Sequence, residues 1–154
     1  MMKVKHSFLV FAAAFLMVMP AFAKTGVAYQ RQDSLRIVSL LQQAKAMKKK
    51  PANWMMWFGK QFVGIPYVGG TLDRTREEQL VVNTRELDCT TYVEIVTALT
   101  MCAKHQETSF AAFCNHLKHV RYIGGEVAYV KRQHYFTLWV DEPKASCNWK
   151  DGWT

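Results

Sequence analysis

Apolar residues recur every three to four positions over residues 33–48, which is the spacing of one face of an α-helix. Asp33 or Ser34 can cap this helix, because a short polar side chain accepts a hydrogen bond from the free backbone N–H groups of the first turn. The residues expected on the buried face are Ile37, Leu40, Leu41, Ala44 and Met47. The pattern therefore predicts an amphipathic helix that ends near Lys48.

A second helix is predicted from Pro51 onward, because proline is tolerated in the first turn of a helix. Trp54, Phe58 and Phe62 recur every four residues and would form the apolar face of this helix. Aromatic residues at that spacing are more typical of a hydrophobic core than of a platform for stacking sugars. We therefore assign the three rings to the core.

Two more helices are predicted in the second half of the chain. One runs from Cys89 to about Ala103, and either Asp88 or Thr91 can cap it; Thr91 also stands at capping-box spacing from Glu94. Ser109 is the expected cap of the last helix. The apolar residues of that last helix are Phe110, Phe113, Cys114 and Leu117.

The segments between and after the helices are rich in turn residues. Gly64–Gly70 is a turn-rich loop, and residues 75–86 are polar around Leu80–Val82, so we expect an extended loop there. Gly124-Gly125 breaks the chain again, and alternation typical of a strand begins at Tyr135. Helices first and strands last predict an α+β fold.

The start of the chain has the pattern of a secretory signal peptide. Lys3 and Lys5 form a basic start, Phe8–Met19 is apolar, and Ala21–Ala23 fits the cleavage pattern. The apolar segment is too short to span a bilayer comfortably, so we favour a cleaved signal and an exported, periplasmic or secreted protein without a stable membrane span. The predicted division is 1–23 as signal peptide and 24–154 as a single domain.

The formal net charge is +8, and loss of Lys3 and Lys5 with the signal would leave +6. A basic chain can bind nucleic acid or an anionic polymer of the cell envelope. Export favours the envelope polymer, and no nucleic-acid-binding motif stands out, so we expect no nucleic-acid partner. The cluster Lys48–Lys50 is expected to be the solvated end of a helix, where cations suit the helix dipole.

All four cysteines follow the predicted signal, at Cys89, Cys102, Cys114 and Cys147. Export would permit disulfides, and two alternatives are open for Cys102 and Cys114. They can pair across a helical hairpin, or both can be buried as small apolar side chains. No C-x-x-C pair or zinc-like spacing occurs, so we expect no metal site and no cofactor.

Cys89 is the strongest candidate for chemistry. At a helix N-terminus its sulfur would face unpaired N–H groups and the positive end of the dipole, which favour the nucleophilic thiolate. His134 opens the strand-like segment 45 residues later. One cysteine opening a helix and one histidine opening a later strand is the order expected of a papain-like cysteine hydrolase, with His134 as the base.

Three segments, Gly64–Leu72, Leu87–Thr91 and His134–Trp139, together resemble a bacterial family. It is the N-acetylmuramoyl-L-alanine amidase-like branch of the NlpC-type cell-wall cysteine hydrolases, and the resemblance covers roughly residues 50–150. It implies a papain-like core in which a central antiparallel sheet packs against the cysteine helix. The family's domain continues well past its histidine strand, whereas this chain ends about twenty residues after His134, so we expect a C-terminally truncated member.

The resemblance also implies roles for further residues. The hydroxyl of Tyr67 would form an oxyanion hole with the backbone N–H of Cys89, although a tyrosine in such a turn can equally serve packing. Asp88 would bind the amino group of a stem peptide, with Thr90 nearby, in addition to its capping role. Asn148 lies about where an orienting residue for the histidine is expected, and Asp141 is the alternative.

Taken together, these features predict an exported cysteine hydrolase that cleaves an amide of peptidoglycan or of a muropeptide through a thioester. The sequence leaves the identity of the amide and the oligomeric state open. One alternative is a non-catalytic, truncated module that binds peptidoglycan or another envelope polymer. Another is a small cationic secreted protein whose resemblance to the family is incidental.

Overall fold

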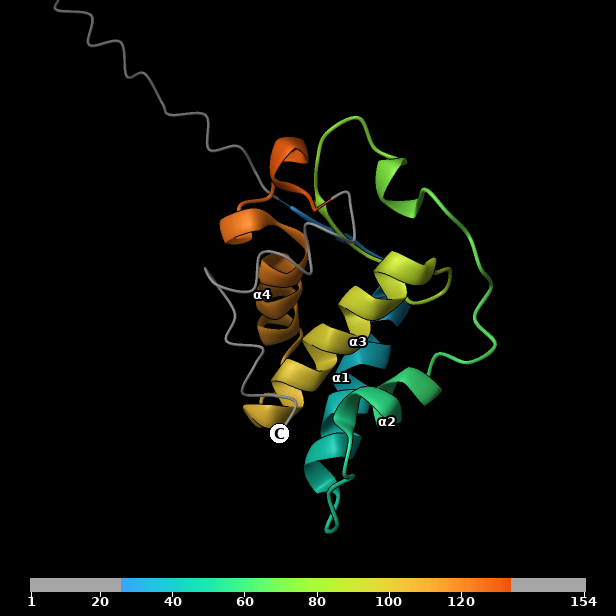
Figure 1. Cartoon of the computed structure of the whole chain (residues 1–154), viewed down its shortest axis with the longest axis vertical. Helices are drawn as coiled ribbons and strands as arrows, with labels where there is room; N and C mark the ends of the chain where they lie inside the picture. Colours follow the sequence, from blue (N-terminus) through green and yellow to red (C-terminus); the bar gives the residue numbers. More distant parts are fainter. Residues whose placement is uncertain (1–25, 134–154) are drawn as a thin grey trace, which may run out of the picture.

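The computed structural model describes residues 26–133 of the chain (Figure 1). The predicted signal peptide and the strand-like segment from His134 onward lie outside the described residues. The elements, in chain order, are β1 (Val27–Tyr29), α1 (Arg31–Ala46), α2 (Trp54–Lys60), β2 (Leu80–Val82), α3 (Cys89–Lys104) and α4 (Phe110–Arg121). Three short 3₁₀ turns, at Thr71–Asp73, Ile123–Gly125 and Tyr129–Lys131, complete the described part.

The predicted buried face of α1 is confirmed except at Met47, which is half-buried and follows the last residue of the helix, and the predicted cap is wrong. Ile37, Leu40, Leu41 and Ala44 are all buried. The helix starts at Arg31 with Gln30 as the capping residue, and Asp33 lies in the first turn, where its Oδ2 accepts a hydrogen bond from the backbone N–H of Gln30 at 2.9 Å. Asp33 thus acts from inside the helix, as the acidic half of a capping box does.

The start predicted for α2 is also wrong. Asn53 caps this helix, and its Oδ1 accepts a hydrogen bond from the N–H of Met56 at 3.0 Å, so Pro51 lies before the first turn. The expected core rings are confirmed for Phe58 and Phe62, which are buried, whereas Trp54 is only half-buried. The ammonium of Lys50 lies 3.1 Å from the carbonyl oxygen of Ala44, as expected for cations at the end of α1.

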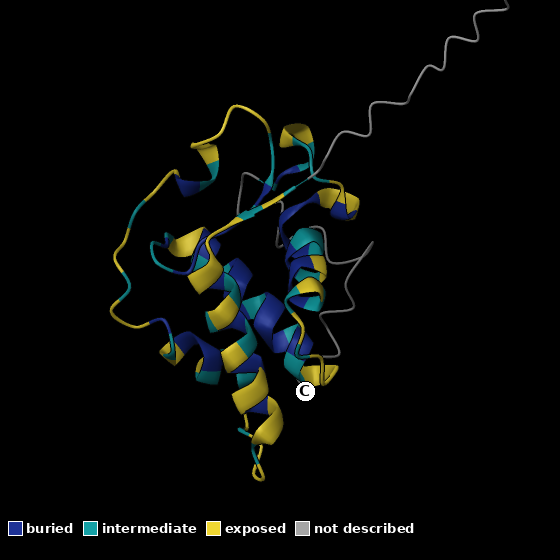
Figure 2. Cartoon of the chain, turned by 180° about the vertical axis from the view of Figure 1, so that it is seen from behind, coloured by how far each residue is buried: buried dark blue, intermediate teal, exposed yellow. Residues whose placement is uncertain are grey.

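Helix α3 lies at the centre of the described residues and packs against α4, α2 and α1 (Figure 1). Its bounds agree with the prediction, and so does the start of α4, where the Ser109 hydroxyl accepts a hydrogen bond from the N–H of Ala112. The buried residues of α3 include Ile95, Ala98 and Leu99. Figure 2 shows buried positions where the helices face one another and exposed positions on their outer faces.

The sheet differs from the prediction. Leu80–Val82, expected to be part of a loop, is strand β2, and it pairs in parallel with β1 so that Val27 faces Leu80 and Tyr29 faces Val82. Parallel strands need a long crossover connection, which α1 and α2 provide. The described sheet is therefore parallel, and β1 precedes the helices, which the sequence did not predict. The antiparallel sheet expected after the helices falls on the segment from His134 onward, outside the described residues. The mixed helix and strand content is consistent with the α+β class.

Buried ionic contacts join the strands to the helices. Nε of Arg121, at the end of α4, donates to a carboxylate oxygen of Glu94 on α3 at 2.8 Å, and the same guanidinium donates to the carbonyl oxygen of Val81 at 2.6 Å. Both side chains are buried. Breaking such a pair costs several kcal/mol, about 3–5, because one charge is left uncompensated. These contacts fix α3 relative to β2.

Candidate functional site

Cys89 is the first residue of α3, and its side chain is exposed. Asp88 caps the helix: its Oδ1 accepts a hydrogen bond from the N–H of Thr91 at 2.8 Å. The hydroxyl oxygen of Thr91 in turn accepts one from the N–H of Asp88 at 3.0 Å. This reciprocal pair decides between the two predicted caps in favour of Asp88, and it holds the sulfur at the positive end of the helix dipole.

The glycine-rich loop docks directly beside this helix start. The N–H of Leu87 donates to the carbonyl oxygen of Pro66 at 3.1 Å, and the N–H of Val68 donates to the carbonyl oxygen of Leu87 at 3.0 Å. These bonds form a short parallel bridge between Tyr67 and Leu87. The bridge pairs Tyr67 with Leu87, which is two positions before Cys89. Tyr67 and Cys89 themselves are 22 positions apart along the chain.

Two glycines allow the loop to take this course. Gly64 and Gly70 have φ angles of 87° and 70°, in the left-handed region that side chains with a Cβ rarely adopt. They bracket the bridged segment, so the loop turns into and away from Leu87 at these two positions. The glycine pattern seen in the sequence thus has a backbone reason.

A pocket of about 220 Å³ opens between the loop and the start of α3. It is lined by Phe62, Ile65, Tyr67, Leu87, Asp88, Cys89 and Tyr92. Apolar and aromatic side chains form most of the lining, and the predicted site residues Tyr67, Asp88 and Cys89 are all part of it. An apolar cleft with a few convergent polar groups is the usual form of a small-molecule site.

The sequence alone did not point to the apolar lining residues. Phe62 was assigned to the core, and Tyr92 had no assigned role, yet their rings meet edge to face at a centroid distance of 6.5 Å beside the pocket. Tyr92 in turn lies against Gly59 of α2, where a Cβ would come within 2.5 Å of the Tyr92 hydroxyl oxygen. Its position three residues after Cys89, on the same side of α3, was the available signal.

The remaining predicted site residues are placed differently. The Thr90 hydroxyl lies 3.9 Å from the Cys89 sulfur, but Thr90 is not among the described residues that line the pocket. His134, Asn148 and Asp141 lie outside the described residues, so their positions stay predictions. The structure therefore brings together Cys89, Asp88 and Tyr67 among the predicted site residues.

The described chain ends just before His134, and its last residues are well anchored. The N–H of Gln133 donates to the carbonyl oxygen of Arg121 at 2.9 Å. The guanidinium of Arg132 forms ion pairs with Asp73 and Glu78. These contacts tie the segment that leads into His134 to the end of α4 and to the loop before β2.

For Cys102 and Cys114, the structure supports burial as small apolar side chains rather than a disulfide. Cys102 and Cys114 are both buried and both carry free thiols, as expected for small apolar side chains in a core. Burial raises the pKa of the Cys102 thiol to about 12 and that of the Cys114 thiol to about 11. Both sulfurs therefore stay protonated at neutral pH.

Within residues 26–133 no helix is long and apolar enough to cross a membrane.

Comparison with known proteins shows the family to which the chain belongs. Residues 57–151, more than half of the chain, match a family described as AmiA-like, N-acetylmuramoyl-L-alanine amidase-like. No curated protein matches the chain.

The chain is also similar to solved structures, among them an amidase of the same description. An N-acetylmuramoyl-L-alanine amidase from Bacteroides uniformis has a TM-score of 0.54 and 34% sequence identity, over 66% of this chain and 39% of its own. A Bacteroides fragilis protein provisionally named a xylanase has a TM-score of 0.52 and 35% identity, over 55% of this chain and 37% of its own. A Legionella pneumophila protein of the DUF1460 family has a TM-score of 0.52 and 26% identity, over 68% of this chain and 34% of its own. The chain thus spans less than two fifths of the length of these relatives.

Proposed function

The chain belongs to the N-acetylmuramoyl-L-alanine amidase-like family, and from this premise we propose that it is an exported cysteine hydrolase that cleaves an amide bond of peptidoglycan or of a released muropeptide. The observation that carries the proposal is the convergence of Cys89, Asp88 and Tyr67 on one pocket at the start of α3. A nucleophile and a hydroxyl donor beside one small cavity are two of the parts that acyl transfer requires, the anionic group is suited to bind substrate, and His134 is proposed as the base.

In this mechanism the thiolate of Cys89 attacks the carbonyl carbon of the scissile amide. The C–N bond then breaks, the leaving nitrogen takes a proton from His134, and a thioester to Cys89 remains. Water, deprotonated by His134, attacks the thioester and releases the acid and the free thiolate. Asn148, or alternatively Asp141, orients the imidazole of His134.

Tyr67 and the backbone of Cys89 have a defined part in the first step. As the thiolate attacks, negative charge develops on the carbonyl oxygen. The Tyr67 hydroxyl and the N–H of Cys89 would donate hydrogen bonds to that oxygen, and donors of this kind favour the transition state over the ground state. Tyr67 is 74% exposed, so its hydroxyl is free to reach a bound substrate.

Asp88 is suited to hold the amino group of a stem peptide. Both hydrogen bonds from Thr91, through its N–H and its hydroxyl, end on Oδ1 of Asp88 at 2.8 Å. Among the described residues, Oδ2 has no hydrogen-bond partner, and Asp88 lines the pocket. One carboxylate can therefore cap the helix and bind an ammonium group at the same time.

A glycosidase activity, which the name of the Bacteroides fragilis relative suggests for that protein, has less support in this chain. Most glycoside hydrolases use two carboxyl groups, about 5–10 Å apart, on either side of the scissile bond. Asp88 is the single carboxylate among the described residues that line the pocket. Cys89 beside it favours acyl transfer.

The test measures binding and turnover of muropeptides in the same folded, reduced preparation of the full chain. Products are followed by liquid chromatography and mass spectrometry. Cys89→Ala and His134→Ala should each remove nearly all product, and the double variant should lose little more, because nucleophile and base act as one unit. His119→Gln serves as the control, since His119 bonds to the carbonyl oxygen of Asn115 on α4 and lies outside the pocket.

Three outcomes would reject this proposal. Muropeptide binding without product, in wild type and Cys89→Ala alike, would favour the alternative of a non-catalytic envelope-binding module. Product that persists in Cys89→Ala would exclude the cysteine mechanism. A chain without either binding or product would point to the small cationic interaction protein.

A further inference from the structure

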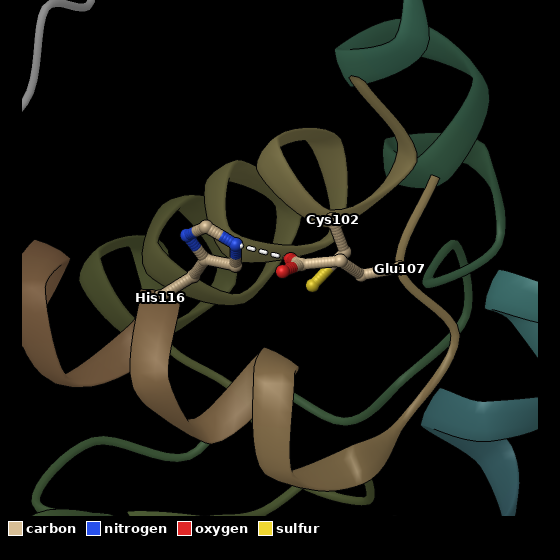
Figure 3. A group of neighbouring side chains, drawn as sticks. All are labelled: Cys102, Glu107 and His116. Carbon is tan, nitrogen blue, oxygen red and sulfur yellow. Dashed lines mark hydrogen bonds and ion pairs between the residues drawn. The ribbon is translucent and has the colours of Figure 1, made fainter. Parts of the chain in front are cut away.

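The turn between α3 and α4 brings together three side chains that bind metals, far from the Cys89 pocket. The sulfur of Cys102, a carboxylate oxygen of Glu107 and a ring nitrogen of His116 all lie within 4.8 Å of one another (Figure 3). Cys102 is thirteen residues after Cys89 on the same helix, which at the helical rise corresponds to about 20 Å. The two sites are therefore independent.

The backbone of the turn holds these groups in place. The N–H of Glu107 donates to the carbonyl oxygen of Cys102 at 2.9 Å, which closes the end of α3. Gln106 takes a left-handed φ of 58°, and Ser109 caps α4 directly afterwards. His116 lies two turns into α4, where the ring of His105 stacks on it at a centroid distance of 5.6 Å. Cys102 and His116 thus come from two helices that pack against each other, and Glu107 comes from the turn that joins them.

The donor set has the chemistry of a zinc site. Thiolate, imidazole and carboxylate are the ligands that Zn²⁺ prefers, and one thiolate with one carboxylate would neutralise the charge of the ion. Tetrahedral zinc with these bond lengths separates its ligand atoms by about 3.3–3.6 Å. The spread of up to 4.8 Å is only slightly wider, so small side-chain rotations would complete the coordination.

The exposure of the three side chains is compatible with an ion that binds from solvent. The side chain of Glu107 is 42% exposed and that of His116 is 16% exposed, while Cys102 is buried behind them. An ion would enter at the carboxylate, and water would fill the fourth position on that side. Three protein ligands with one open position is a known zinc arrangement.

We propose that Cys102, Glu107 and His116 form a binding site for Zn²⁺ that joins the end of α3 to α4. Nε2 of His116 lies 2.6 Å from a carboxylate oxygen of Glu107, and the ion would replace this contact (Figure 3). The Cys102 S–H bond breaks, its proton goes to solvent, and the sulfur binds the metal. The imidazole coordinates through its unprotonated nitrogen.

Binding through the Cys102 sulfur requires the thiol to lose its proton, which gives the site a pH dependence. Because the metal competes with that proton, affinity should fall as the pH is lowered. Protons should be released to an indicator dye when metal is added at neutral pH.

The experiment titrates Co²⁺ into the full chain, reduced and freed of metal with a chelator. The expected result is one equivalent of bound Co²⁺ with the visible bands of tetrahedral cobalt and an intense thiolate-to-cobalt charge-transfer band, all removed by Zn²⁺. Glu107→Gln, His116→Gln and Cys102→Ser should each weaken Co²⁺ binding at least about tenfold, since even the outer partners of a metal contribute that much.

Two matched variants serve as controls. Cys89→Ala removes the exposed thiol among residues 26–133, and His119→Gln removes a histidine elsewhere on α4; both should keep the full spectrum. Cys102→Ser alters a buried position, so circular dichroism checks its fold. Glu107 is exposed, and Glu107→Gln carries the test if the Cys102 variant unfolds.

The proposal fails if wild type shows no thiolate-to-cobalt band, or if the band persists unweakened in Glu107→Gln or His116→Gln. Loss of the band in Cys89→Ala would also overturn it, because the metal would then be held by the pocket cysteine. None of these results depends on hydrolase activity, so the outcome is separate from that of the proposed function.

Discussion

At the scale of single residues, one of the three described cysteines is exposed and the other two are buried. Cys89 is exposed at a helix start, whereas Cys102 and Cys114 are buried among the helices. A thiolate reacts with electrophiles far faster than a thiol, and it must also be reachable. The side chain's surroundings, rather than its chemical type, therefore single out Cys89.

We expect iodoacetamide at pH 7.5 to alkylate Cys89 well before the two buried cysteines. Burial raises the pKa of Cys102 to about 12 and that of Cys114 to about 11, so their thiolate fractions are very small at this pH. Peptide mass spectrometry over time measures each rate. Raising the pH toward 9 should leave the order unchanged, and equal rates for Cys89 and Cys114 in folded protein would contradict the prediction.

Tyr67 provides a second residue-scale prediction. If its hydroxyl stabilises the developing oxyanion, Tyr67→Phe should lower kcat with little effect on KM. One lost oxyanion donor costs up to about 10²–10³-fold in rate. Steady-state kinetics with a purified muropeptide gives both constants.

The control for Tyr67 is Tyr29→Phe, because Tyr29 is also exposed but stacks on Phe110, outside the pocket. That variant should retain wild-type kinetics. An unchanged kcat in Tyr67→Phe would leave Tyr67 with the packing role that was its alternative.

At the scale of secondary-structure elements, α2 and α3 support the pocket through one close contact. Gly59 of α2 lies against Tyr92 of α3, and a Cβ there would meet the Tyr92 hydroxyl oxygen at 2.5 Å. Tyr92 and Phe62 both line the pocket. The packing of these two helices therefore sets the shape of the pocket beside Cys89.

Gly59→Ala should destabilise the protein although alanine is the better helix former. Overpacking costs about 1–3 kcal/mol, and the helix preference returns at most about 1 kcal/mol. Adding Tyr92→Phe should restore most of the loss, because it removes the clashing oxygen. Urea unfolding followed by circular dichroism measures the free energy of unfolding.

Gly69→Ala is the matched control, because a Cβ at Gly69 would meet nothing within 4 Å. Its unfolding free energy should stay close to that of wild type. Equal stability of the Gly59 and Gly69 variants would contradict the proposed contact.

At the scale of the whole molecule, buried ionic contacts join segments that are distant in sequence. Asp33 of α1 accepts hydrogen bonds from the N–H and hydroxyl of Thr84, just after β2, at 2.9 and 2.8 Å. The Glu94–Arg121 pair links α3 to α4 and reaches β2. The pocket residues are thus held by a framework that spans most of the described chain.

Processing on export is a prediction for the whole chain. The predicted signal peptide should be removed after Ala23, which would leave Lys24 as the mature N-terminus, since Ala21 and Ala23 suit signal peptidase. N-terminal sequencing of protein recovered from the periplasm or medium measures this. Exported protein that still begins at Met1 would contradict the prediction, and an Ala23→Arg variant should slow cleavage.

The sequence by itself determined the features that depend on neighbouring residues. The bounds of α3, the Ser109 cap and the buried face of α1 followed from apolar spacing and capping side chains, which act within a few residues. The same local signals placed Cys89 at a helix N-terminus. The early start of α1 was missed, because Asp33 suits the first turn of a helix as well as its cap.

Only the tertiary structure decided which distant segments meet. The parallel pairing of β1 with β2 joins residues about fifty positions apart. The hydrophobic pattern of a three-residue strand is too short to predict which strand it pairs with. The docking of Tyr67 against Leu87 made a pocket from the loop and α3. Cys102, Glu107 and His116 have no familiar ligand spacing, and they converge because a helical hairpin folds the chain back on itself. Such contacts arise from packing of the whole chain, which local sequence patterns do not encode.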